Sequence, residues 1–459
     1  MYAGLRFPVA PEEETEYGLP EDLLRFLDKI PTLSAEEKKS LAEGLRHPCP
    51  DPAVLEYRAL LAEELLASPP LQQALSNLAR LGRLLPDRIP TREVDALRTV
   101  ARFESFATLF DEFCKTLQGL IPESEGAKRC LRFLKFYAES FEYRELKHKC
   151  AELMASFGFS HGFLCAVGNP DEEGTALLTR PEQKEGLAAT VQAVMTRFSV
   201  QPADFPQPPQ RDYSDTEIAL LTGMIRGETA PARRLEDFFA AYIACGTEDL
   251  VRLSREAAFF TAMTKVYTEF LRLGGTVCRP LFRAPGYYSD ITDLCYFTEE
   301  GMARADFSAS PLSPITVVCG PDAAAYLQSV AVAHAVASVG GLVFAQKAEI
   351  SPCDRLERDE GGKVSAEALS ENSLCLCGNL FDTMLPRQEE AAAKAVLLYL
   401  SERSTRSVVR ITAQSNLAAL QKQSEEGTLP PCIFVRAGTD RTLEDLLKRH
   451  QKTEESDHD

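Results

Sequence analysis

The chain lacks the features that would mark a membrane, exported or zinc-binding protein. No uninterrupted apolar run reaches the roughly 20 residues that a membrane-spanning helix needs. Residues 1–14 contain no basic stretch followed by an apolar one, so we expect no signal peptide. The 13 cysteines include no tandem CxxC pairs, and the one close pair, Cys375 and Cys377, lies on an apolar run, which argues against a zinc site. A reducing cytoplasm is therefore the expected compartment.

Positive charge is also in short supply. Lysine and arginine number 50 against 68 aspartate and glutamate residues, which gives a net charge of −18. Such a chain repels a nucleic-acid backbone unless a local basic patch overcomes the overall field. Two short patches are candidates, one formed by Lys128, Arg129, Arg132 and Lys135, the other by residues 144–149. A solvated helix face is the default interpretation of both.

Common catalytic constellations are missing as well. The sequence offers no Ser-His-Asp, Cys-His or HExxH arrangement that would mark a hydrolase or a metalloprotease. His334 lies in a helical run, where a packed or surface histidine is the ordinary explanation. We therefore expect no catalytic residue and no metal ligand.

What is present is enough apolar sequence for two or three domains, since 45% of the 459 residues are hydrophobic. The first half is predicted to be helical. Ser34 to Glu37 has the form of a capping box, and leucine and phenylalanine stripes predict long helices over 93–120 and 127–157. Next come a β-hairpin near 162–180, a proline-rich loop over 199–214, and helices over 233–244 and 247–273, the last capped by Gly274 and Gly275.

The second half alternates short apolar runs with helical segments. The apolar runs cover 315–319, 342–344, 373–377 and 408–412, and the helical segments cover 323–338 and 387–402. Strands that alternate with helices predict an α/β layer built on a parallel sheet.

The stretch from Ile315 to Val332 has the outline of a phosphate-binding loop, a buried strand followed by a tight turn and a helix. A working loop needs glycines that wrap a phosphate, then a lysine for the phosphate and a hydroxyl for the metal. Here the turn is Gly320-Pro321-Asp322, and Ala323, Ala324 and Ala325 follow it. The architecture of the loop is predicted and its chemistry is absent.

The order of segments in this half resembles the ATPase domain of MutS-type mismatch-repair proteins, which begins with a GPN phosphate-loop motif. The turn at Gly320 and the following Tyr326-Leu327 match the start of that pattern. The matching later segments are Ala335 to Arg355, Asn372 to Phe381, which resembles the Walker B strand, and Val409 to Thr412, which resembles the strand before a Thr-His switch.

Segments of the first half agree with this resemblance, which covers roughly residues 50–450. They are Tyr57 to Asp87, Cys165 to Asp171, and the helix 247–273 with Cys278, Pro280, Asp293 and Leu294 after it. Residues 1–19 are rich in proline and glutamate and residues 451–459 are polar, so we expect a flexible N-terminus and a disordered tail. Between them, the resemblance implies a helical lever/core domain (20–275) and a P-loop-type, ABC-ATPase-like α/β domain (276–450). It also implies a dimer, and in active members ATP, Mg²⁺ and DNA as ligands.

The departures from the family pattern all fall on the ATPase chemistry. The loop at Gly320 is about three residues short and lacks the lysine and the Ser/Thr that hold phosphate and Mg²⁺. Gly378 and Asn379 stand where a Walker B acid is needed, and Ala413 stands at the histidine switch. The chain between Arg358 and Glu371 is too short for the family's signature segment, and Lys363 there is best explained as a solvated loop residue.

These losses predict a pseudo-ATPase that acts as a non-catalytic structural or regulatory subunit. The expected partner is a second copy or an active MutS-type relative, with no cofactor and no membrane. One alternative is a DNA-dependent ATPase that binds ATP and Mg²⁺ through a rearranged site. Another is an ATP-independent DNA-binding module, although no long clamp insertion is visible between residues 180 and 215.

Overall fold

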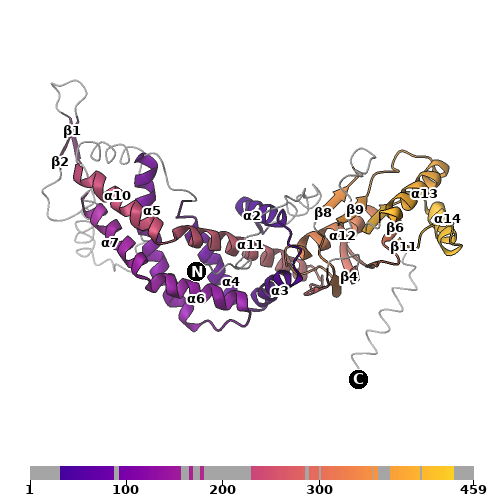
Figure 1. Ribbon diagram of the computed structural model, residues 1–459, viewed down its shortest axis with the longest axis horizontal. Coiled ribbons are helices and arrows are strands. Elements are labelled where there is room, and N and C mark those ends of the chain that lie inside the picture. The colour runs from indigo at the N-terminus through magenta and orange to yellow at the C-terminus, as the bar shows by residue number, and fades with distance from the viewer. Residues whose placement is uncertain are drawn as a thin grey trace, which may run out of the picture. The chain divides into compact units, whose positions relative to one another are not determined.

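The computed structural model (Figure 1) describes residues 32–86, 93–156, 165–168, 176–179, 229–284, 289–298, 301–353, 355–359, 373–403 and 406–438. The predictions for the termini 1–19 and 451–459, the proline-rich loop 199–214 and Lys363 lie outside these residues. The chain divides into two compact units, one made chiefly of Gln73–Ile121 and Lys128–Ala258, the other of Leu5–Gln72, Pro122–Ala127 and Phe259–Asp459. In the described part of the chain, no helix is both long and apolar enough to cross a membrane.

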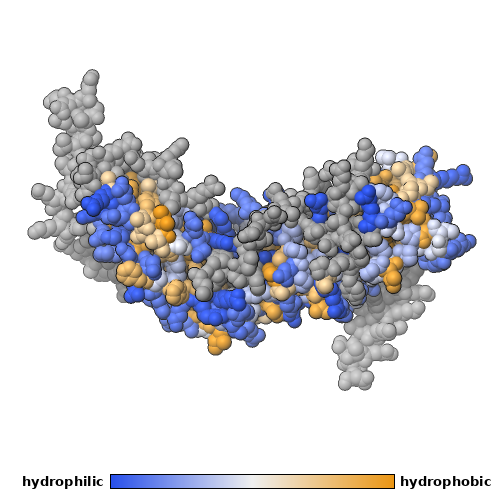
Figure 2. Space-filling view, in the orientation of Figure 1, coloured by the Kyte–Doolittle hydropathy of each residue, from blue (hydrophilic) through white to orange (hydrophobic). Residues whose placement is uncertain are grey.

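The first unit is built from helices. They are α4 (Pro69–Gly82, which begins in the second unit), α5 (Glu93–Thr116), the 3₁₀ turn η1 (Leu117–Gly119), α6 (Glu125–Glu139), α7 (Phe141–Ser156), α10 (Thr229–Ala244) and the first half of α11 (Thr247–Arg272). Its core is aromatic: the rings of Phe103, Phe106, Phe110 and Tyr143 are fully buried. Hydrophobic residues also remain on its surface (Figure 2), among them Phe136 and Phe141.

The predicted single helix over 127–157 is wrong, because the structure breaks it into α6 and α7 at Ser140. The hydroxyl of Ser140 accepts a hydrogen bond from the Tyr143 N–H at 3.1 Å and so caps the start of α7. The predicted hairpin is confirmed by the antiparallel strands β1 (Cys165–Gly168) and β2 (Ala176–Thr179). The end of α11 is also confirmed, since Gly274 adopts φ +83° directly after it.

The second unit contains the early helices α2 (Ala35–Leu45) and α3 (Pro52–Ala67) together with both larger sheets. The capping box is confirmed: the Glu37 N–H donates to the Ser34 hydroxyl at 3.3 Å and the Ser34 N–H donates to the Glu37 carboxylate at 2.9 Å. Lys265 of α11 then binds the same carboxylate at 2.6 Å. One glutamate thus stabilises the start of α2 and joins it to α11.

The predicted parallel sheet is confirmed. It has five strands in the order β11-β6-β10-β9-β8, and every neighbouring pair is parallel. The strands are β6 (Ile315–Cys319), β8 (Arg355–Arg358), β9 (Ser373–Cys377), β10 (Arg406–Arg410) and β11 (Cys432–Arg436). One face packs on the helices α13 (Pro386–Glu402) and α14 (Gln414–Glu425) through a buried cluster that includes Val317, Cys375 and Leu397.

A second sheet was not predicted from the sequence. It is mixed, with the order β3-β7-β4-β5, and its strands are β3 (Leu281–Phe282), β7 (Lys347–Ile350), β4 (Ser289–Thr298) and β5 (Gly301–Ala309). Its longest strands carry polar and charged residues, and β4 is interrupted by a bulge where Asp293 takes φ +52°, so no continuous apolar run marks them. The apolar run 342–344 forms only an isolated bridge, between Val343 and Cys278.

Helix α12 (Ala323–Ala337) contacts both sheets and is buried along most of its length. The Tyr326 hydroxyl donates to the Asp306 carbonyl of β5 at 2.8 Å, and the His334 ring packs edge-on against Phe307 at 5.5 Å. The described residues therefore form an α+β fold in which α12 bridges the mixed and the parallel sheet.

Candidate functional site

The three segments predicted to carry the degenerate ATPase motifs lie at one edge of the parallel sheet. Gly320 follows β6, Gly378 and Asn379 follow β9, and Ala413 comes shortly after β10. Because these strands are parallel, their carboxyl ends meet at the same edge. The chain leaves β6 toward the β8 side of the sheet and leaves β10 toward β11 on the other side. In open α/β sheets a ligand binds in the crevice that such a reversal creates, which here lies between β6 and β10.

The turn after β6 is covered by the chain segment that follows β11. Gly320 adopts φ +122°, and a Cβ atom at this position would lie 2.0 Å from the carbonyl oxygen of Ala437. The Ala437 N–H donates to the Cys319 carbonyl at 2.9 Å, which fixes the chain after β11 against the turn. Glycine is therefore required here for close packing of backbone on backbone.

The start of α12 carries its own negative charge. A Cβ atom on Gly438 would lie 2.5 Å from a carboxylate oxygen of Asp322, the N-cap residue of the helix. That carboxylate makes no capping hydrogen bond to the helix, although it lies at the end where the helix dipole favours an anion. Asp322 would repel a phosphate at the position where a working phosphate loop attracts one.

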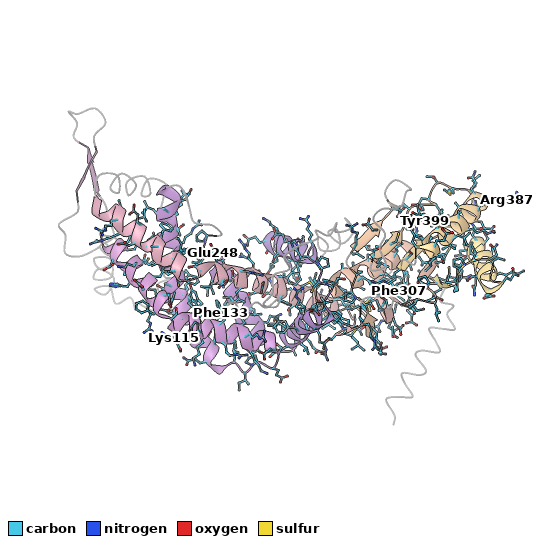
Figure 3. All side chains as sticks on the ribbon, viewed as in Figure 1. Lys115, Phe133, Glu248, Phe307, Arg387 and Tyr399 are labelled. Atoms are coloured by element: carbon cyan, nitrogen blue, oxygen red, sulfur yellow. The ribbon has the colours of Figure 1, made fainter. Side chains whose placement is uncertain are left out.

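Glu389 supplies a second carboxylate, at the start of α14, the helix that follows β10. It lies in the first turn of α13, the helix on which Figure 3 labels the exposed Arg387, but the side chain of Glu389 is fully buried. One carboxylate oxygen accepts from the N–H of Thr412 and from its hydroxyl at 2.7 Å. The other accepts from the Ala413 N–H at 3.0 Å and from the Asn416 side-chain amide at 2.8 Å. An internal carboxylate thus caps the N-terminus of α14, and the switch-position residue Ala413 is one of its donors.

A third carboxylate, that of Asp359, binds the turn after β9, where the Walker B acid was expected. The carboxylate of Asp359 accepts from the N–H groups of Gly378 and Asn379 at 2.7 and 2.9 Å. The Gly378 carbonyl in turn accepts from Arg410 at 2.8 Å, and Arg410 also pairs with Asp382 at 3.0 Å. The main-chain groups at the ends of β9 and β10 are therefore already bound to side chains of the protein itself.

The electrostatic effect of this arrangement is visible at Cys319, the last residue of β6. Burial raises the pKa of its thiol, and the negative charge of Glu389 raises it further, whereas Arg436 and Arg410 oppose the shift. Glu389 is thus close enough to β6 to act on the last residue of that strand.

Sequence reasoning placed Gly320, Gly378, Asn379 and Ala413 at one site but missed the carboxylates of Asp359 and Glu389. The one sequence signal for Glu389 was its place in the first turn of the predicted helix 387–402, where an acidic residue stabilises a helix start. No sequence signal marked Asp359, because its partners lie about 20 residues further along the chain.

Two other sequence candidates lie away from this edge. His334 is fully buried, and its Nε2 atom lies 3.1 Å from the hydroxyl oxygen of Ser289. The same hydroxyl accepts a hydrogen bond from Arg406, whose side chain also donates to the Ser351 carbonyl at 2.9 Å. Burial, followed by the charge of Arg406, lowers the pKa of His334 to about 3. His334 is therefore a fully buried, neutral histidine whose hydrogen bonds join α12 to β4.

The two basic patches differ. In the patch 144–149, Lys147 pairs with Asp111, and both Lys149 and the His148 ring lie 3.3 Å from the carboxylate of Glu152. In the other patch, Lys128, Arg132 and Lys135 are exposed on α6. Among the residues that the structure describes, no cluster of three or more His, Cys, Asp or Glu side chains could hold a metal ion.

No family model matches this chain, and no curated protein does either. The chemistry of the sheet edge is therefore the basis for any functional conclusion. That edge offers the carboxylates of Asp322, Asp359 and Glu389 and no lysine, and its Arg410 is already bound to the Gly378 carbonyl and to Asp382, whereas phosphate binding requires available N–H groups and cations.

Proposed function

We propose that the chain is a MutS-related pseudo-ATPase that acts as a non-catalytic structural or regulatory dimer subunit. One observation carries the proposal: the fully buried carboxylate of Glu389 accepts four hydrogen bonds from the start of α14. These donors lie at the crevice where a P-loop-type domain would hold its nucleotide. The meeting of the predicted motif positions at one parallel-sheet edge supports the P-loop-type assignment.

The expected loss of affinity is large. A charge-assisted hydrogen bond to phosphate contributes roughly 1.5–3 kcal/mol, and the sequence lacks the lysine and the hydroxyl that would provide several of them. Losing even three such contacts weakens binding by a factor of about 10³ or more, from micromolar to millimolar. Asp322 and Glu389 add repulsion to this loss, because a triphosphate would approach two carboxylates.

Isothermal titration of the full-length chain with ATP and Mg²⁺ tests the proposal. We expect no saturable binding below about 1 mM. Micromolar ATP affinity that requires Mg²⁺ would overturn the pseudo-enzyme assignment and favour the alternative of an active ATPase with a rearranged site. A second experiment asks whether the chain co-purifies with an ATP-hydrolysing MutS-type relative, as expected for a regulatory subunit.

A further inference from the structure

Strand β11 forms one end of the five-stranded sheet (Figure 1). It pairs with β6 on one side. On its other side, no strand within the described part of the chain pairs with it. Such an edge presents a row of main-chain N–H and C=O groups to any extended chain that fits it.

The hydrogen bonds of β11 show which groups face outward. The Ala437 N–H donates to the Cys319 carbonyl, so residue 437 faces β6. Backbone groups alternate along a strand, so residues 433 and 435 face β6 as well, and Phe434 and Arg436 direct their N–H and C=O groups outward. Cys432 follows the same alternation, since its N–H donates to the Ser424 hydroxyl at 3.3 Å.

The edge at β11 lacks the features that keep strand edges from pairing. Its centre is Ile433-Phe434-Val435, and it contains no lysine, no proline and no shift in its register with β6. These three side chains are only partly buried. The opposite edge of the same sheet differs, because three of the four residues of β8 are charged, Arg355, Glu357 and Arg358. The β8 edge thus carries three charged residues, whereas β11 carries one, Arg436, at its end.

We propose that a second copy of this chain occupies the outer edge of β11, through antiparallel pairing centred on Phe434. In this register Phe434 lies opposite Phe434 of the second copy, and their main-chain groups form a reciprocal pair of hydrogen bonds. The Arg436 N–H of each copy then donates to the Cys432 carbonyl of the other copy. The two parallel sheets join into one continuous sheet across a two-fold axis.

The side chains suit this self-pairing. Arg436 faces Cys432 of the second copy, so no like charges oppose each other, although each chain is strongly acidic. Phe434 packs partly on the cluster beneath α13 and α14, so two phenylalanine rings lie side by side on that face of the joined sheet. The Cys432 N–H keeps its bond to Ser424 and does not need a partner from the second copy.

This inference rests on the proposed role as a dimer subunit and deepens it by naming the partner and the contact. The test is the molar mass of the full-length chain by light scattering, between about 1 and 100 μM. We expect a dimer of twice the chain mass in the upper part of this range. Hydrogen exchange should slow at the Phe434 and Arg436 amides as the concentration rises.

Two variants separate pairing from folding. Phe434→Lys places a lysine on the edge, and Arg436→Pro removes one outward N–H without touching the Phe434 side chain. Each should raise the dimer dissociation constant about tenfold or more. The control Gln421→Lys changes an exposed residue of the neighbouring helix α14 and should leave the constant unchanged. Circular dichroism confirms that each variant is folded.

A wild-type monomer at the highest concentration overturns the proposal, as does a dimer that survives both edge variants unchanged. The result is distinguishable from failure of the proposed function. Micromolar ATP binding by an edge-paired dimer contradicts the pseudo-ATPase and leaves the pairing intact. A monomer that binds no ATP contradicts the pairing and leaves the pseudo-ATPase intact.

Discussion

Replacing Glu389 by glutamine tests whether an internal carboxylate holds together the sheet edge at the carboxyl ends of β6 and β10. Glutamine has almost the same shape, but one carboxylate oxygen becomes an NH₂ group that cannot accept hydrogen bonds. If the oxygen that faces Thr412 is kept, the NH₂ group faces the Ala413 N–H and the Asn416 amide. Asn416 cannot turn its amide without giving up its 2.7 Å bond to the Pro386 carbonyl.

The structure sets the size of the effect. Whichever way the glutamine amide turns, two donors lose their acceptor, and at least one of them is a main-chain N–H. A lost hydrogen bond to a charged group costs roughly 1.5–3 kcal/mol, and relief from burying a charge offsets part of this. We expect Glu389→Gln to lower the free energy of unfolding by about 2–4 kcal/mol.

Urea denaturation followed by circular dichroism measures this change, with an unchanged m value as the sign that the same structure unfolds. Glu390→Gln is the matched control, because Glu390 is the next residue of α13 but lies near the surface and pairs with Lys394. It should change stability much less. If Glu389→Gln proves as stable as the wild type to within about 0.5 kcal/mol, the carboxylate does not hold the start of α14.

Two further predictions concern the turn after β6 and the buried histidine. Gly320→Ala should lower the free energy of unfolding by about 2–4 kcal/mol, because it adds backbone strain at φ +122° and a clash with the Ala437 carbonyl. The control Gly427→Ala lies at φ +74° with no atom within 4 Å of the added Cβ, so it should lower the free energy of unfolding by only about 1 kcal/mol in the same urea titration. His334 has a folded-state pKa of about 3, below its unfolded value of 6.5, so the wild type should lose stability as pH falls from about 6.5 toward 3, at up to about 1.4 kcal/mol per pH unit. His334→Gln should flatten this slope by about one proton in urea titrations at successive pH values, and an unchanged slope would show that His334 is not the group that titrates.

The sequence predicted those parts of the fold that a continuous apolar run encodes. β6 and β9 stand out because both faces of a parallel sheet are covered, so nearly every residue in them is apolar. β10 was placed about two residues too late, at 408–412 against Arg406–Arg410, because Arg406 is charged and yet fully buried. The mixed sheet was missed because its strands alternate apolar with charged residues around a bulge.

The sequence predicted which segments end at this edge of the parallel sheet, but not the carboxylates that bind them. That Gly320, Gly378 and Ala413 would meet followed from parallel strands and the resemblance together. That Glu389 would accept from residues more than 20 positions away could not follow from spacing, because it depends on how α13 docks on the sheet. Similarly, Ser140 breaks a helix whose leucine and phenylalanine stripe runs on across the break.

Under the proposed pseudo-ATPase assignment, the loss of phosphate-binding chemistry and the stability of this fold have one physical origin. The N-terminus of a helix and the turns after parallel strands gather N–H groups that need an acceptor. In a nucleotide-binding protein the phosphates supply that acceptor on binding, and part of the fold's order then depends on the ligand. Here Glu389 and Asp359 supply it permanently, so the free energy that a ligand would contribute on binding is contributed on folding. It follows that ATP should raise the melting temperature of this chain very little, even at millimolar concentration, although the sheet edge keeps its architecture.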